Sequence, residues 1–222
     1  MKKQNSAQSD LKNTITYQNM FWLFMIGNVL GVILEGIWSK MLLGHWETHV
    51  VTIWGPFCLI YGVAAVVMYI GAVMTQNRNI VVQFSVIAII ASIVELICGL
   101  ILEFGMGMRA WNYSAMPFNF RGHICLKMSL MWGVIGIIFS RFMLKPLNHM
   151  FDRLNRNYWK HFCTILSVFM AVNLALTLGC MLRWKNRHNS IEPKTYIGQI
   201  IDKNYDDTKM QKRFCEWYFI ET

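Results

Sequence analysis

Charged residues are scarce in this chain of 222 residues. Asp, Glu, Lys and Arg make up only 15% of it, whereas 55% is hydrophobic. Soluble globular domains carry charged residues at about 25% of their positions. The composition therefore excludes an ordinary soluble domain and predicts an integral membrane protein.

The sequence also lacks the common signatures of nucleotide-binding proteins and of enzymes. It contains no G-x-x-x-x-G-K-[ST] loop, so any ATP that drives this protein would be bound by another chain. No Ser-His-Asp or Cys-His arrangement is apparent, and we predict neither catalytic residues nor a cofactor. The segment His45-x-Glu47-x-His49 lacks a third ligand at standard spacing, so we predict no metal site.

The cysteines do not form a recognisable disulfide pattern. Five of the six lie within apolar runs, where a thiol acts as a small apolar side chain. We therefore predict no disulfide framework. These five are Cys58, Cys98, Cys125, Cys163 and Cys180, and the sixth is Cys215.

Five apolar runs are long enough to cross a bilayer as helices, which takes about 20 residues. They cover residues 20–43, 55–74, 80–104, 124–144 and 162–182. Lys2 and Lys3 precede the first run, but no small-residue cleavage site follows it, so we interpret it as a retained span. The sequence thus predicts an all-α membrane protein with about five transmembrane helices.

These runs divide the chain into four parts. A polar segment, 1–19, precedes a four-helix membrane core, 20–144. Residues 145–182 contain a basic loop and the fifth helix. Residues 183–222 form a basic polar tail, which is too short to hold a core of its own.

The net charge of +9 bears on topology and on contact with anionic lipid headgroups rather than on nucleic acid. Lys and Arg accumulate on the cytoplasmic side of a membrane, which favours a cytoplasmic N-terminus for the first four spans. Five spans would then place the basic tail outside. Three alternatives remain open: the tail is exported against the charge bias, the N-terminus is outside, or one run does not cross.

Two nearly identical pentapeptides indicate an internal duplication. Residues 31–35 read GVILE and residues 99–103 read GLILE, and each lies within an apolar run. A glycine follows each glutamate 20 or 19 residues later, and a cysteine follows each glycine after three more. We predict two parallel helix pairs, 20–74 and 80–144, related by a pseudo-twofold axis along the membrane normal.

The spans also carry small residues and acids on the same faces. Small residues let membrane helices approach closely, and we predict this packing role for Gly27, Gly31, Gly55, Gly62, Gly99, Gly122 and Gly133. Intramembrane acids are costly and mark functional sites, so Glu35, Glu95 and Glu103 are candidate ligands for a cation, a proton or a cationic group. The plain alternative is that these faces enclose no site. The glycines would then serve packing alone, and the acids would extend toward the lipid headgroups.

The segments that flank these acids resemble a known family. Trp54 to Gly62 reads WGPFCLIYG, Trp111 to Ser114 reads WNYS, and Pro117 to Leu126 reads PFNFRGHICL. With Glu35 and Glu103, these motifs resemble the bacterial family named putative ABC-transporter permease, type IV, over roughly residues 21–144. Leu59 and Asn112 stand where that family has proline and aspartate. The resemblance implies a permease in the bacterial inner membrane.

The third loop has two interpretations, whereas the start of the second span has one. The aromatic residues and arginines of the loop fit an interfacial belt. Alternatively, Asn112, Tyr113, Ser114 and Asn119 form a polar lid over a carboxylate chamber. Gly55 and Pro56 are expected to begin the second span, with Pro56 in the first helical turn, where no hydrogen-bond donor is lost.

We therefore expect a multi-pass permease or transport-associated protein in which Glu35 and Glu103 bind a cationic group or exchange protons with it. Its expected partners are the lipid bilayer, a separate ATPase subunit and a second copy of the chain. The competing class is a scaffold that binds another membrane protein or lipid without transport. A third class is a lipid-modifying enzyme that uses a carboxylate as general base.

Overall fold

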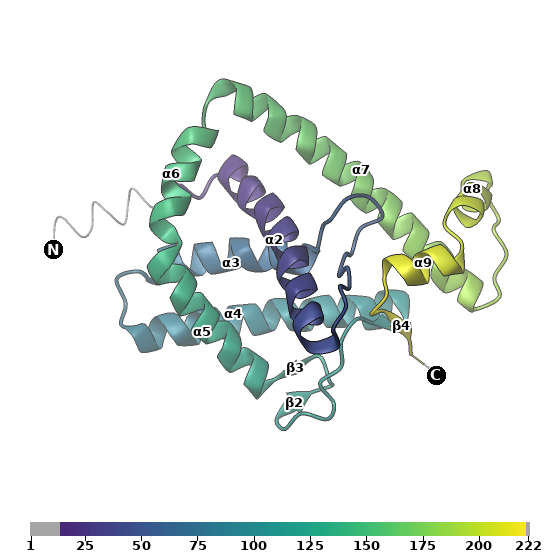
Figure 1. Cartoon of the computed structure of the whole chain (residues 1–222), viewed down its shortest axis with the longest axis horizontal. Coiled ribbons are helices and arrows are strands. Elements are labelled where there is room, and N and C mark those ends of the chain that lie inside the picture. Colours follow the sequence, from purple (N-terminus) through teal and green to yellow (C-terminus); the bar gives the residue numbers. More distant parts are fainter. Residues whose placement is uncertain (1–13, 221–222) are drawn as a thin grey trace.

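The computed structural model describes residues 14–220, and helices form most of this part of the chain. The helices are α2 (Tyr17–Leu43), α3 (Leu59–Thr75), α4 (Ile80–Leu100), the π-helix η1 (Ile101–Met106), α5 (Leu126–Phe142), α6 (Leu144–Leu154), α7 (Asn157–His188), α8 (Tyr196–Asn204) and α9 (Asp207–Arg213), as Figure 1 shows. Four two-residue strands form two antiparallel pairs. They are β1 (Met108–Arg109) with β4 (Tyr218–Phe219), and β2 (Asn119–Phe120) with β3 (Ile124–Cys125).

Three helices of the described chain are long and apolar enough to cross a membrane. They are α2, the continuous α4 and η1 from Ile80 to Met106, and α7. Helices α5 and α6 make a fourth candidate if the pair, bent by 61°, counts as one span. The all-α membrane architecture is thus confirmed, but three or four such spans replace the expected five. Helix α3 has only 17 residues, about 26 Å at 1.5 Å per residue, which falls short of a hydrocarbon core of about 30 Å.

Helix α3 is short because it begins later than expected. The prediction that Gly55 and Pro56 begin this helix is wrong: the first helical residue is Leu59 and the N-cap is Cys58. Gly55 has a φ of 75°, in the left-handed region, which ends any regular helix there. Phe57 is buried with Met25 of α2 and Met170 of α7, so this segment packs as a loop between two helices.

The predicted basic loop after the fourth span is largely helical. Residues Leu144–Leu154 form the strongly amphipathic helix α6, which buries Phe151 and Leu154 and exposes its charged side chains. Phe151 packs edge-on against Tyr69 of α3, with ring centroids 5.4 Å apart. An amphipathic helix of this kind suits the membrane interface. Helix α7 then begins at Asn157, five residues before the expected start.

The helices pack in the pairs that the sequence predicts, α2 with α3 and α4 with α5. A Cβ added at Gly31 would lie 2.4 Å from the ring of Tyr61, and one at Gly62 would lie 2.3 Å from Asn28. In the second pair, a Cβ at Gly133 would lie 2.6 Å from Phe84. Cys58 and Cys125 are the N-caps of α3 and α5, which is a further likeness between the pairs. The duplication itself stays a prediction.

The C-terminal tail folds back on the loops at one end of the helices (Figure 1). Strand β4 pairs with β1, and Arg213 Nε donates to the carbonyl oxygen of Thr52 at 2.9 Å. The tail does not hold a separate core but shares one with α7 and the loops. The buried members of this core are Ile53, Met108, Cys180, Met181, Trp184, Ile201, Met210 and Phe214. The tail therefore lies at the same end of the helices as the first and third loops.

Candidate functional site

A cavity of about 500 Å³ lies among α2, α3, α4, α5, the third loop and the tail. Most of its lining is apolar, and three carboxylates face it, those of Glu35, Glu95 and Glu216. No lysine or arginine of the described chain is among the residues that line it, and His49 is its one basic side chain. Aromatic rings make up another part of the lining, from Tyr61, Trp111, Tyr113, Trp132, Phe214 and Trp217.

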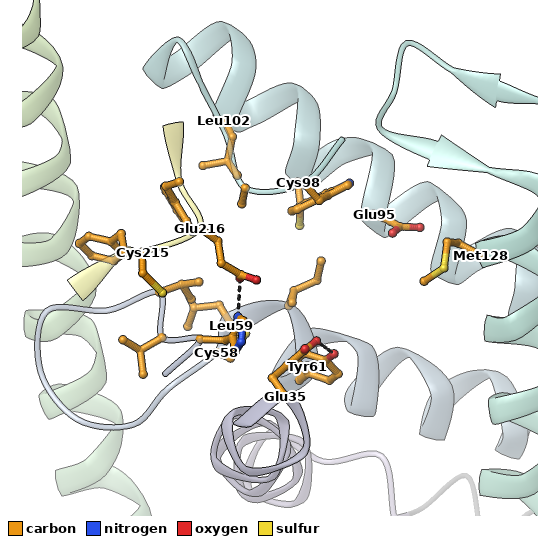
Figure 2. A pocket seen from close by; sticks show the side chains of 18 of the residues that line it. Glu35, Cys58, Leu59, Tyr61, Glu95, Cys98, Leu102, Met128, Cys215 and Glu216 are labelled. Atoms are coloured by element: carbon orange, nitrogen blue, oxygen red, sulfur yellow. Dashed lines mark hydrogen bonds and ion pairs between the residues drawn. The ribbon is translucent and has the colours of Figure 1, made fainter. Parts of the chain in front are cut away.

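Glu35 lies two turns before the end of α2 and is half-buried. Its carboxylate accepts a hydrogen bond from the hydroxyl of Tyr61 on α3, as Figure 2 shows. Gly31 precedes Glu35 by one turn on the same face, and its missing side chain leaves the space that the Tyr61 ring occupies. The glycine and the glutamate of the first pentapeptide therefore act together to position this pair.

Glu95 lies near the middle of the long helix Ile80–Met106 and is 4% exposed. Its two oxygens accept from Tyr113 Oη at 3.0 Å and from Trp132 Nε1 at 3.2 Å. Both donors are uncharged. Within the described residues, no Lys, Arg or His nitrogen lies within 4.0 Å of either Glu95 or Glu35. Among residues 14–220, these two carboxylates therefore have no basic partner.

Glu103 has a different environment and does not line the cavity. Arg109 Nη2 lies 2.7 Å from its carboxylate, and Arg121 Nη2 lies 3.2 Å away. His123 Nε2 contacts the same carboxylate at 2.8 Å, and burial lowers the pKa of this histidine although the neighbouring carboxylate opposes the shift. The structure thus brings Glu35 and Glu95 to one cavity and leaves Glu103 outside it, in an ion-pair cluster that ties η1 to the third loop.

The predicted polar lid contributes one side chain to the cavity, that of Tyr113. Burial, followed by the charge of Glu95, raises the pKa of its phenol well above the ordinary range, so Tyr113 stays a hydrogen-bond donor. The other three predicted residues hold the loop in shape. Asn112 Oδ1 accepts from the Ser114 hydroxyl at 2.6 Å, and Asn119 Nδ2 donates to the Met116 carbonyl at 2.8 Å.

Comparison with protein families finds a match to the model described as Putative ABC-transporter type IV, over residues 22–178. The chain belongs to this family. The resemblance of the sequence motifs is therefore confirmed, and the long apolar helices make this member of the Putative ABC-transporter type IV family a multi-pass membrane protein. Comparison with curated proteins finds no match, and comparison with solved structures finds none either.

The family match includes Glu35, Glu95 and Tyr113 but ends before the tail, which supplies another wall of the cavity. Glu216 Oε2 lies 2.6 Å from His49 Nδ1 of the first loop, and Figure 2 marks this contact. His49 Nε2 in turn lies 2.7 Å from the hydroxyl of Ser39 on α2. Burial raises the pKa of Glu216, and the hydrogen bond from His49 partly offsets this shift.

Sequence reasoning missed this contribution of the tail. A signal was present, because residues 214–220 read FCEWYFI and form an apolar run within an otherwise polar segment. Such a run requires burial against other parts of the protein. Its partners are the first loop and β1, which lie far away in the sequence, so the run alone does not place Glu216 beside His49.

Proposed function

We propose that this protein is a permease-like or transport-associated component of the bacterial inner membrane that binds a cation or a cationic group at Glu35 and Glu95. One observation carries the proposal: two acids from different helices share an apolar cavity, and neither has a basic partner among the described residues. A buried carboxylate that lacks a counter-charge is costly. A bound cation would supply the missing positive charge, and a proton on Glu95 would neutralise that carboxylate when the cation is absent.

The same geometry indicates how binding and release could be coupled. Cation and proton would compete for Glu95 because each neutralises the same carboxylate. Tyr113 and Trp132 donate to that carboxylate and hold its position in either state. Glu103 has no part in binding, since its ion pairs already neutralise it. This replaces the sequence-based pairing of Glu35 with Glu103 by the pairing of Glu35 with Glu95.

Binding can be tested by thermal unfolding of the purified protein in nanodiscs. The additives are sodium, tetramethylammonium, tetraethylammonium and tetraphenylphosphonium chlorides at constant ionic strength. We expect at least one of these cations to raise the Tm, and we expect Glu35→Gln and Glu95→Gln each to remove that increase. A ligand present at 100 times its Kd stabilises the folded state by about 2.7 kcal/mol.

The matched control is Glu192→Gln, which neutralises an exposed acid in the tail. This variant is expected to keep the full increase. The proposal fails if no cation raises the Tm of the unsubstituted protein, or if the increase survives in both cavity variants.

Membership in the family, together with the absence of a nucleotide-binding loop from the sequence, supports a separate ATPase subunit as partner. We expect an ATPase to co-purify with the tagged protein in mild detergent, and to do so equally with Glu95→Gln. Recovery of another membrane protein in its place, combined with full activity of the Glu95→Gln variant, would instead favour the scaffold class.

A further inference from the structure

We infer that the ligand of this cavity is a lipophilic organic cation, an ammonium or phosphonium centre that carries apolar groups. This inference rests on the proposed function and names its substrate class. Three features of the cavity carry it: the chemistry of the lining, the volume, and the aromatic groups that hold the carboxylates.

The lining does not suit an inorganic cation. Sodium and divalent cations need about six oxygen ligands to replace their hydration shells. The lining of the cavity is mainly hydrocarbon and sulfur, with contributions from Ile60, Cys98, Leu102, Met128 and Ile135. An ion stripped of water there would lack most of its ligands, whereas an organic cation brings its own apolar shell.

The volume fits a molecule rather than an ion. Pockets for small organic ligands measure about 300–1,000 Å³, and this cavity has about 500 Å³. Parts of its wall also remain accessible on the membrane helices, because Met131 is 45% exposed and Ile135 is 40% exposed. A lipophilic cation that is dissolved in the bilayer would meet a compatible surface along α5.

Aromatic rings accompany both acids. Tyr61 donates to Glu35, while Tyr113 and Trp132 donate to Glu95. Each ring that fixes a carboxylate also lines the cavity, where Trp111 and Trp217 add two further π surfaces. Aromatic faces together with a carboxylate are the combination that recognises quaternary ammonium groups.

The decisive experiment compares two ions of the same shape and opposite charge. Equilibrium binding of radiolabelled tetraphenylphosphonium and tetraphenylborate is measured on the full-length protein in nanodiscs, with empty nanodiscs subtracted. We expect saturable binding of tetraphenylphosphonium and none of tetraphenylborate. Glu95→Gln should weaken phosphonium binding by about thirtyfold or more.

Two substitutions of Tyr113 separate its ring from its hydroxyl. Tyr113→Phe keeps the aromatic face, and Tyr113→Leu removes it. We expect Tyr113→Leu to weaken phosphonium binding by about fivefold relative to Tyr113→Phe. Equal binding by the two variants would overturn the aromatic part of the inference.

The remaining outcomes distinguish failure of this inference from failure of the proposed function. If sodium alone stabilises the protein and Glu95→Gln removes that effect, the ligand is an inorganic ion, so the inference fails and the proposed function stands. If phosphonium and borate bind equally and Glu95→Gln changes neither, the cavity is only an apolar pocket. That result would overturn both.

Discussion

Alanine in place of Gly31 is expected to destabilise the protein by about 1–3 kcal/mol, the range for an overpacked contact. The added Cβ would lie 2.4 Å from both Cβ and Cγ of Tyr61, so α2 and α3 would have to separate. The same shift would draw the Tyr61 hydroxyl away from Glu35. We therefore expect the substitution to weaken cation binding as well as folding.

Gly71→Ala is the matched control for this prediction, because Gly71 is also a buried helical glycine. A Cβ at Gly71 would meet only Ile87 Cγ1, at an ordinary distance of 3.4 Å. Any gain in helix propensity applies to both variants, so the difference between their free energies of unfolding isolates the steric contact. Denaturation of the two purified proteins measures it. Equal stability would show that the contact between Gly31 and Tyr61 does not limit how closely α2 and α3 approach.

Removal of the Asp202 carboxylate is expected to release the tail. The stability of the local fold should fall by about 3–5 kcal/mol. Arg183 Nη2 lies 2.6 Å from this carboxylate and Arg187 Nη1 lies 2.5 Å from it. Both guanidinium groups are largely buried, with 10% and 16% of their side chains exposed. In Asp202→Ala they would lose their shared counter-charge, and α8 would lose its ion pairs with α7.

Hydrogen exchange of residues 196–220 measures this release, with Asp207→Ala as the control. Asp207 also pairs with Arg187, but 62% of its side chain is exposed, so its loss should cost less than about 1 kcal/mol. Equal exchange in the two variants would contradict the assignment of Asp202 as the centre of the attachment.

The same ion pairs set a pH dependence for the tail. Hydrogen bonds from Arg183 and Arg187 lower the pKa of Asp202 below its ordinary value. The stabilisation is therefore complete above the unfolded pKa of about 3.9 and is lost as the pH falls through the lower, folded value. Between pH 5 and pH 8 we expect Asp202 to hold the tail with constant strength.

The long apolar helices α2, α4 and α7 could be predicted from the sequence because a bilayer imposes a length and a composition on each span, whereas the shortness of α3 could not. Glu35 and Glu95 could be chosen as site residues for a related reason, since an acid within an apolar helix must have a use or a partner. The local repeat of glycine and glutamate also indicated which face of α2 meets α3. These are properties of single segments, and they can be read without knowing the fold.

The role of Glu103 could not be predicted, because its partners come from the third loop. Arg109, Arg121 and His123 lie 6 to 20 residues after it in the chain, and only the path of the loop decides whether they point toward η1. The contribution of Glu216 is still harder to predict from the sequence, since it depends on the return of the tail to the first loop. In both cases, residues outside the helix or strand that carries the acid decide whether a partner neutralises it.

The central claim is that the cavity attracts cations because no basic group of the described residues pairs with Glu35 or Glu95, and Cys98 offers the most direct test. This thiol lies one turn after Glu95 on α4 and lines the same cavity (Figure 2). In a variant with Cys98 as its one cysteine, the rates of modification by trimethylammonium-ethyl and sulfonatoethyl methanethiosulfonate are compared with those of a free thiol. We predict an excess preference for the cationic reagent of about tenfold, lost when Glu35→Gln and Glu95→Gln are combined. A preference equal to that of the free thiol, or one unchanged by the double substitution, would contradict the claim.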